Sequence, residues 1–148
     1  MIGIVAALFC TLIIAGISSY CFNLDLKWYF ALNKPHFVVS SGWFAFFVAV
    51  NYASCILALS RLVEHKHLFP SMLFFLILGA SDIMFLLFFF RLKIILAAAF
   101  FITASQALAY TLFVRFMMKD FKIALEFLPA FLFHCYAFIC ALSIVMLN

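Results

Sequence analysis

The stretch from Trp28 to Phe37 reads W-Y-F-A-L-N-K-P-H-F; it is aromatic, charged and proline-bearing, and long apolar runs lie on both sides of it. The chain of 148 residues is 71% hydrophobic and only 9% charged, whereas a soluble domain carries roughly 25% charged residues. Apolar runs of this length cannot lie on a surface that faces water, so the sequence predicts an integral membrane protein. The basic residues are scattered singly, which gives no indication of nucleic-acid binding.

The apolar runs predict an all-α, integral membrane bundle of five transmembrane helices in one domain, residues 1–148. A helix needs about 20 apolar residues to cross a bilayer and satisfies its own backbone in lipid. Strands of a barrel alternate over about ten residues, whereas these runs are apolar on both faces. The expected spans are residues 1–22, 43–61, 70–90, 94–116 and 123–147, with a loop at 23–42.

The loop carries a family motif. It resembles the pattern Trp-Tyr-x-x-Leu-x-Lys-Pro-x-Trp of the translocator protein or tryptophan-rich sensory protein family (TspO/MBR). The matching residues are Trp28, Tyr29, Leu32, Lys34 and Pro35, and Phe37 replaces the last Trp.

The resemblance extends along the chain to its last span. On the third span Asp82 takes an Asn position of the family, Phe85 takes a Trp position, and Phe89-Phe90 fit paired aromatics. The last span keeps the family register at Pro129, Ala137, Ile144, Leu147 and Asn148, with Phe133 for Trp and Ala141 for Asn. The chain is therefore identified as a divergent member that is poor in tryptophan.

The resemblance implies a receptor or binding protein for a hydrophobic ligand in a bacterial or organellar membrane. A tetrapyrrole such as protoporphyrin or haem is the first expectation, and a sterol-like lipid is the second. No cofactor is required. The implied partners are membrane lipid, the ligand and a second copy in a homodimer, for which Gly79-Ala80 and Ala97 to Ala99 offer small surfaces. The alternatives are a transporter of such ligands and a small scaffold protein without a ligand.

An enzymatic role is disfavoured. Some relatives have been proposed to degrade porphyrins with light, using pocket tryptophans, and here Val48 and Phe133 stand at two of those positions. Phosphate-loop, zinc-protease and nucleophile-elbow motifs are absent from the sequence. Sterol-type patterns, such as Leu108, Tyr110 and Arg115, arise by chance in so apolar a chain.

The loop at 23–42 is expected to be a lid over a ligand pocket, and Lys34 is expected to meet a carboxylate of the ligand. The pocket walls are expected on the second, third and fifth spans. The predicted ligand-binding residues are Trp28, Tyr29, Lys34, Pro35, Phe37, Val48, Tyr52, Asp82, Phe85, Phe133, Tyr136, Ala137 and Ala141.

Asp82 is the most unusual residue within a span. An acid at mid-span costs about 2.5–3.5 kcal/mol on insertion scales, so it should turn inward and find a partner or be protonated. A neutral acid hydrogen-bonded to a neighbouring helix is favoured over a catalytic role. His134 can donate to Asp82 or ligate haem iron, but a lone His is more often structural, so no metal site is predicted. His65-x-His67 is too short to indicate metal binding.

Overall fold

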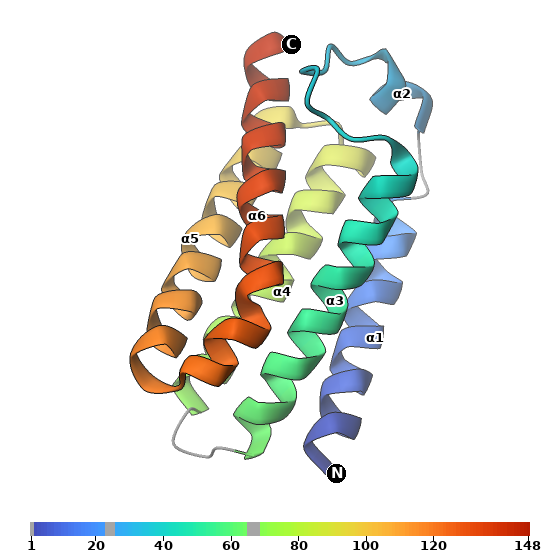
Figure 1. Cartoon of the computed structure of the whole chain (residues 1–148). Helices are drawn as coiled ribbons and strands as arrows, with labels where there is room; N and C mark the ends of the chain where they lie inside the picture. The colour runs from blue at the N-terminus through green and yellow to red at the C-terminus, as the bar shows by residue number, and fades with distance from the viewer. Residues whose placement is uncertain (1, 23–25, 65–68) are drawn as a thin grey trace.

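A computed structural model of the protein describes residues 2–22, 26–64 and 69–148, and within these ranges all regular structure is helical. Five long helices lie side by side, and the short α2 with the loop after it lies across the end of the bundle at which α6 ends (Figure 1). The elements are α1 (Ile2–Phe22), α2 (Leu26–Ala31), α3 (Ser41–Glu64), α4 (Phe69–Leu86), the π-helical turn η2 (Leu87–Arg91), α5 (Ile95–Lys119) and α6 (Phe121–Leu147).

Among the described residues, four segments are long and apolar enough to cross a membrane. They are Phe46–Val63, Pro70–Arg91, Ile95–Lys119 and Phe121–Leu147. The prediction of a helical chain with membrane-length apolar helices is confirmed. The prediction of five spans is not, because α1 is a helix of 21 residues that is not among the four segments.

Apolar side chains cover the outside of the bundle, while polar side chains lie within it. Leu96, Met118 and Met146 are 77%, 82% and 87% exposed, which suits contact with lipid. Small or polar residues between helices let membrane helices approach closely and hydrogen-bond. The buried polar residues are Thr11, Asn51, Ser54, Ser60, Ser71, Ser81, Ser105 and His134.

α6 packs between α5 and α3, and α1 packs against α3 and α4. A Cβ atom added at Gly79 of α4 would lie 2.9 Å from Cδ1 of Ile14 in α1. The small surface of Gly79 therefore serves the α1–α4 contact within one copy of the chain. Ala98 is likewise buried within the chain, at 1% exposure.

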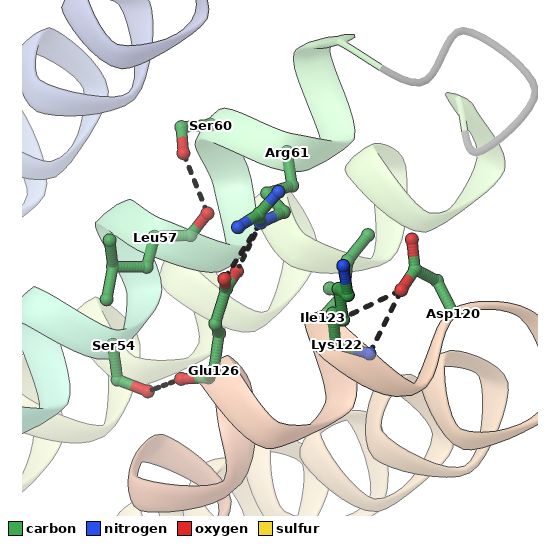
Figure 2. A network of polar contacts seen from close by, with 8 residues as sticks. All are labelled: Ser54, Leu57, Ser60, Arg61, Asp120, Lys122, Ile123 and Glu126. Atoms are coloured by element: carbon green, nitrogen blue, oxygen red, sulfur yellow. Dashed lines mark hydrogen bonds and ion pairs between the residues drawn. The ribbon is translucent and has the colours of Figure 1, made fainter.

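Polar contacts near the start of α6 cap this helix and join it to α3 (Figure 2). The Asp120 carboxylate caps α6 by accepting from the backbone N–H of Lys122 and Ile123, at 3.0 and 3.4 Å. Nε of Arg61 lies 2.8 and 2.9 Å from the two carboxylate oxygens of Glu126. The Ser54 hydroxyl donates to the Glu126 carbonyl oxygen. The network sets the register between α3 and α6.

Candidate functional site

The loop after α2 is tied to the end of α6 by a pair of asparagines. The Asn33 backbone N–H donates to Oδ1 of Asn148 at 3.0 Å, and Nδ2 of Asn148 donates to the Asn33 carbonyl at 3.0 Å. Nδ2 of Asn33 donates to the Leu147 carbonyl at 3.3 Å. The two amide side chains therefore hold the loop against the helix end. Sequence reasoning matched Asn148 to a family position but did not predict this contact.

Tyr136 forms the second attachment of the loop to α6. Its hydroxyl accepts from the Val39 backbone N–H at 2.9 Å and donates to the Phe37 carbonyl at 3.3 Å. Tyr136 was predicted as a pocket residue, and the structure places its hydroxyl against the loop backbone. The Phe37 side chain itself is 49% exposed.

Lys34 folds back on its own segment. Its ammonium donates to the Tyr29 carbonyl at 3.0 Å and lies 4.2 Å from the centre of the Tyr29 ring, which is cation–π distance. An open depression of about 580 Å³ adjoins it, lined by Asn33, Lys34, Pro35, His36, Phe37 and Leu147. Lys34 therefore lines the depression beside the end of α6, while its ammonium is held by Tyr29.

An aromatic cluster joins the loop to α4 through the π-helical turn. The Trp28 ring meets the Phe89 ring edge-on at 5.4 Å, and the Tyr29 ring lies 5.7 Å from that of Phe90. The Phe85 ring lies 5.5 Å from that of Phe89. Three of the predicted site residues thus meet at one cluster. Burial raises the pKa of the Tyr29 phenol, and the nearby Cys140 adds to the shift.

The π-helical turn is what presents two consecutive phenylalanines to the loop. The Leu92 N–H donates to the Leu87 carbonyl at 3.0 Å, a bond over five residues instead of four. Phe89 and Phe90 are only 3% and 6% exposed. Lys93 then adopts a left-handed conformation, with φ of 57°, as α4 gives way to α5. The hydropathy pattern gave no signal for this turn.

Asp82 and His134 meet between α4 and α6. Nε2 of His134 lies 3.1 Å from Oδ2 of Asp82. Nδ1 of the same ring lies 2.8 Å from the Ala130 carbonyl oxygen, which can only accept, so Nδ1 carries a proton. A hydrogen bond between Nε2 and Oδ2 requires one further proton on one of these two atoms. The pair is neutral overall whether that proton sits on the ring or on the carboxyl.

The remaining predicted residues lie on α3 and α6, which pack against each other. The Phe133 ring is perpendicular to the His134 ring at 6.1 Å and lies 6.1 Å from that of Phe44. Val48, Tyr52 and Ala137 are half-buried, and Ala141 is buried. The structure therefore places the predicted residues in two groups, one at the loop and η2, the other among α3, α4 and α6.

The described residues contain no group of three or more His, Cys, Asp or Glu side chains that could hold a metal ion. His65 and His67 lie outside the described residues, as do residues 23–25 of the predicted lid. His134 uses both ring nitrogens on Ala130 and Asp82, which leaves no nitrogen for haem iron in this arrangement.

Comparison with known families agrees with the motif in the loop. The family model of the TspO/MBR family matches residues 4–147, which is nearly the whole chain. No curated protein matches the chain.

Proposed function

This chain belongs to the TspO/MBR family, and from that premise we propose that it is a membrane receptor for a hydrophobic ligand. The family is membrane-embedded and four helices have membrane length, so the protein is a multi-pass integral membrane protein. Family membership points to ligand binding or transport in the membrane. Our proposed ligand is a tetrapyrrole such as protoporphyrin or haem, with a sterol-like lipid second.

The single observation that carries the proposal is the attachment of the aromatic loop to the bundle. Tyr136 and the Asn33–Asn148 pair hold the loop, and Trp28 and Tyr29 extend from it onto the aromatic cluster. Ligand sites are mostly apolar with a few polar groups that fix orientation. The aromatic cluster would supply the apolar wall, and the Asp82–His134 pair would supply the polar groups.

Lys34 would meet a carboxylate of a tetrapyrrole at the membrane surface. Lys34 lines the open depression beside the end of α6, and its ammonium can exchange its bond to the Tyr29 carbonyl for one to a carboxylate. A bond between charged partners is about twice as strong as a neutral one. The loop would then close over the ligand as a lid.

We also propose that α1 is a fifth span. At 1.5 Å per residue its 21 residues reach about 31 Å, which matches a hydrocarbon core of about 30 Å. It also packs along α3 and α4. A homodimer is part of the same proposal; chemical cross-linking in native membranes would test it.

Quenching of Trp28 fluorescence by protoporphyrin tests the proposal. The chain has two tryptophans, and Trp43 is 61% exposed, so Trp43→Phe leaves Trp28 as the reporter. We expect saturable quenching in detergent micelles. In otherwise unaltered protein, Trp28→Ala should weaken protoporphyrin binding about tenfold, as measured by porphyrin absorbance. Absence of quenching, or unchanged affinity in Trp28→Ala, rejects the pocket.

Transport is the second candidate function, and the Asp82–His134 pair favours it, because ionisable residues within spans often mark substrate pathways. Liposomes loaded with protoporphyrin and containing the protein would release it faster than empty liposomes if the protein is a transporter. If the protein binds protoporphyrin but does not speed its release from liposomes, the transporter function is rejected and the receptor function remains.

A further inference from the structure

Arg115 is a cation within a membrane-length helix, and its side chain is half-buried. It stands on α5 four residues before Lys119, the last residue of the segment Ile95–Lys119, which is about 6 Å along the helix axis. Its Nε atom is buried and has no hydrogen-bond partner among the residues that the structure describes. A guanidinium keeps its charge in proteins, so its N–H groups require acceptors.

The guanidinium of Arg115 rests on α4. Its Cζ atom lies 5.2 Å from the centre of the Phe74 ring, which is cation–π distance. Phe74 stands four residues after Pro70, the first residue of the segment Pro70–Arg91. α5 ends and α4 begins at the end of the bundle opposite α2 (Figure 1). The cation and the ring therefore lie at a similar depth, about one helical turn inside the apolar segments.

The acidic side chains that the structure describes near this point are engaged by other groups. The Asp120 carboxylate caps α6. The two carboxylate oxygens of Glu126 lie 2.8 and 2.9 Å from Nε of Arg61. A cation within a membrane span is costly unless it pairs with an anion or reaches the interface. Because neither of these two carboxylates pairs with Arg115, an anion from outside the chain would satisfy it.

Lys119 places a second cation beside Arg115. The two residues are four positions apart on α5, so they share one face of the helix, and Lys119 is exposed. Leu108, seven residues before Arg115, continues this face into the span. On α4, Ile77 follows Phe74 by three residues and is 46% exposed. Two cations near the membrane surface thus adjoin apolar positions deeper in the span.

The structure separates Arg115 from the tyrosine of the sterol-type pattern found in the sequence. The Tyr110 ring lies 6.5 Å from the ring of Phe131 on α6, whereas Arg115 contacts Phe74 on α4. The two residues therefore face different neighbouring helices. A sterol held against Tyr110 would not use Arg115, and the cation requires a different partner.

We propose that Arg115 and Lys119 bind the phosphate of an anionic phospholipid at this end of the bundle, apart from the proposed ligand pocket. Turning the flexible Arg115 side chain outward brings Nε and the Nη groups to the phosphate oxygens, and Lys119 adds its charge from the water side. Arginine suits this role because its planar donors match two phosphate oxygens. Basic sites between membrane helices bind the headgroups of anionic lipids.

A lipid phosphate fits this place better than a phosphate free in water. Arg115 lies inside a membrane-length segment, where a free phosphate would have to leave water, whereas a phospholipid carries its phosphate at the edge of the hydrocarbon. Its acyl chains can lie along the face that contains Leu108 and Ile77. The headgroup should carry a net negative charge, because the ammonium of a zwitterionic lipid would approach two cations.

Native mass spectrometry of the purified full chain in detergent tests the proposal, because it resolves individual bound lipids. The probes are dioleoyl phosphatidylglycerol and dioleoyl phosphatidylcholine, which differ only in the headgroup. We expect the first phosphatidylglycerol to bind about tenfold more tightly than the first phosphatidylcholine, because a hydrogen bond between charged groups contributes at least that factor. Equal affinities in the wild-type protein would overturn the proposal.

Substitutions of Arg115 assign the preference to its guanidinium. Arg115→Gln should reduce the preference for phosphatidylglycerol to about twofold. Arg115→Lys should give an intermediate value, because it keeps the charge but loses the planar donors. Circular dichroism checks that each variant is folded, and if Arg115→Gln does not fold, the wild-type ratio and Arg115→Lys still decide. A preference that is unchanged in the folded variants shows that Arg115 does not bind the lipid.

Arg91→Gln is the matched control. Cζ of Arg91 lies 5.3 Å from the centre of the Tyr20 ring, so this arginine also contacts an aromatic ring, but it is exposed. The control removes the same charge and should keep the wild-type preference. If Arg91→Gln lowers the preference as much as Arg115→Gln does, the effect comes from the net charge of the protein and the proposal is wrong.

Two further outcomes would assign the anion to another source. If inorganic phosphate at millimolar concentration displaces phosphatidylglycerol, the site recognises phosphate without the lipid. If Arg115→Gln leaves lipid binding unchanged but dissociates a dimer in the same spectra, the anion belongs to a second copy. Either result overturns the proposal of a lipid. Protoporphyrin binding is measured separately and does not enter these results, so the receptor function and this inference can fail independently.

Discussion

Nε2 of His134 in α6 lies 3.1 Å from Oδ2 of Asp82 in α4, so two residues that are 52 positions apart satisfy each other inside the bundle. A mid-span acid is expected to turn inward and find a partner or be protonated, and the sequence offers His134 as a candidate partner. The contact with His134 gives the Asp82 carboxyl a polar partner inside the bundle. It also means that neither residue can be changed without affecting the other.

Removing the Asp82 carboxyl should destabilise the bundle unless its replacement can donate. Asp82→Leu leaves Nε2 of the buried His134 without a partner, and we expect a loss of about 1–2 kcal/mol, the range of interhelical hydrogen bonds in membranes. Asp82→Asn should lose less, because its amide donates to Nε2. Unfolding in mixed detergent micelles gives the free energy of each variant. Equal losses for the two variants would show that the hydrogen bond contributes nothing.

Asn148→Ala should free the loop without weakening the bundle. The substitution removes both bonds between the Asn148 side chain and the Asn33 backbone, at positions that are exposed to water. We expect amide hydrogens of residues 32–39 to exchange about tenfold faster, which corresponds to about 1.4 kcal/mol. Hydrogen exchange with mass spectrometry measures this.

Ser143→Ala is the matched control for that experiment, because the Ser143 hydroxyl donates to the Ile139 carbonyl within its own helix, α6. In Ser143→Ala the amide hydrogens of residues 32–39 should exchange at the wild-type rate. If Asn148→Ala leaves exchange at residues 32–39 unchanged, the asparagine pair does not hold the loop.

The helical class and the family could be predicted from the sequence, because each apolar run carries its own signal over about 20 residues. Pairings between distant segments carry no such signal. The Asn33–Asn148 bonds depend on where α6 ends relative to the loop, and the contact of Arg61 Nε with the Glu126 carboxylate depends on the register of two helices. The π-helical turn is a departure of the backbone from the α-helical bond pattern, with Leu92 N–H on the Leu87 carbonyl, and the hydropathy of the segment does not mark it. For the same reason the sequence pointed to Asp82 as unusual, but only the fold shows that its carboxyl contacts His134.

Arg61→Lys should cost about 0.5–1 kcal/mol. The substitution keeps the charge but removes the Nε–H that lies within hydrogen-bond distance of both oxygens of Glu126. The cost stays small because the Arg61 side chain is 44% exposed and water screens the pair. Lys122→Ala is the control, since only the backbone of Lys122 takes part in the cap. If unfolding in detergent shows Lys122→Ala to be less stable than Arg61→Lys, the Arg61–Glu126 contact does not contribute the stability assigned to it.

Gly79 should tolerate alanine but not a large side chain. The atom that a new Cβ would approach, at 2.9 Å, is Cδ1 of Ile14, the end of a flexible side chain that can shift. Alanine also favours the helix by about 1 kcal/mol over glycine, so Gly79→Ala should be close to neutral. Gly79→Leu should push α1 away from α4.

A double-cysteine cross-link between α1 and α4 would report that separation, and its yield should fall in Gly79→Leu only. Gly16→Leu is the control and should leave the yield unchanged, because nothing lies within 4 Å of a Cβ added at Gly16. A yield that stays the same in Gly79→Leu would show that the α1–α4 contact is not formed in the membrane.

Phe89→Leu should weaken the packing of the Trp28 ring against the π-helical turn. The Phe89 ring is 3% exposed and meets the Trp28 ring edge-on at 5.4 Å, and such aromatic pairs contribute about 0.5–1.5 kcal/mol beyond their buried area. In the Trp43→Phe background, Trp28 emission should move to longer wavelength and acrylamide should quench it more strongly, because leucine leaves part of the indole edge uncovered. Phe100→Leu, at an outward position that is 68% exposed, should leave both signals unchanged. Identical emission in Phe89→Leu and the wild type would mean that Trp28 does not rest on this cluster, and the lid would then need a different anchor.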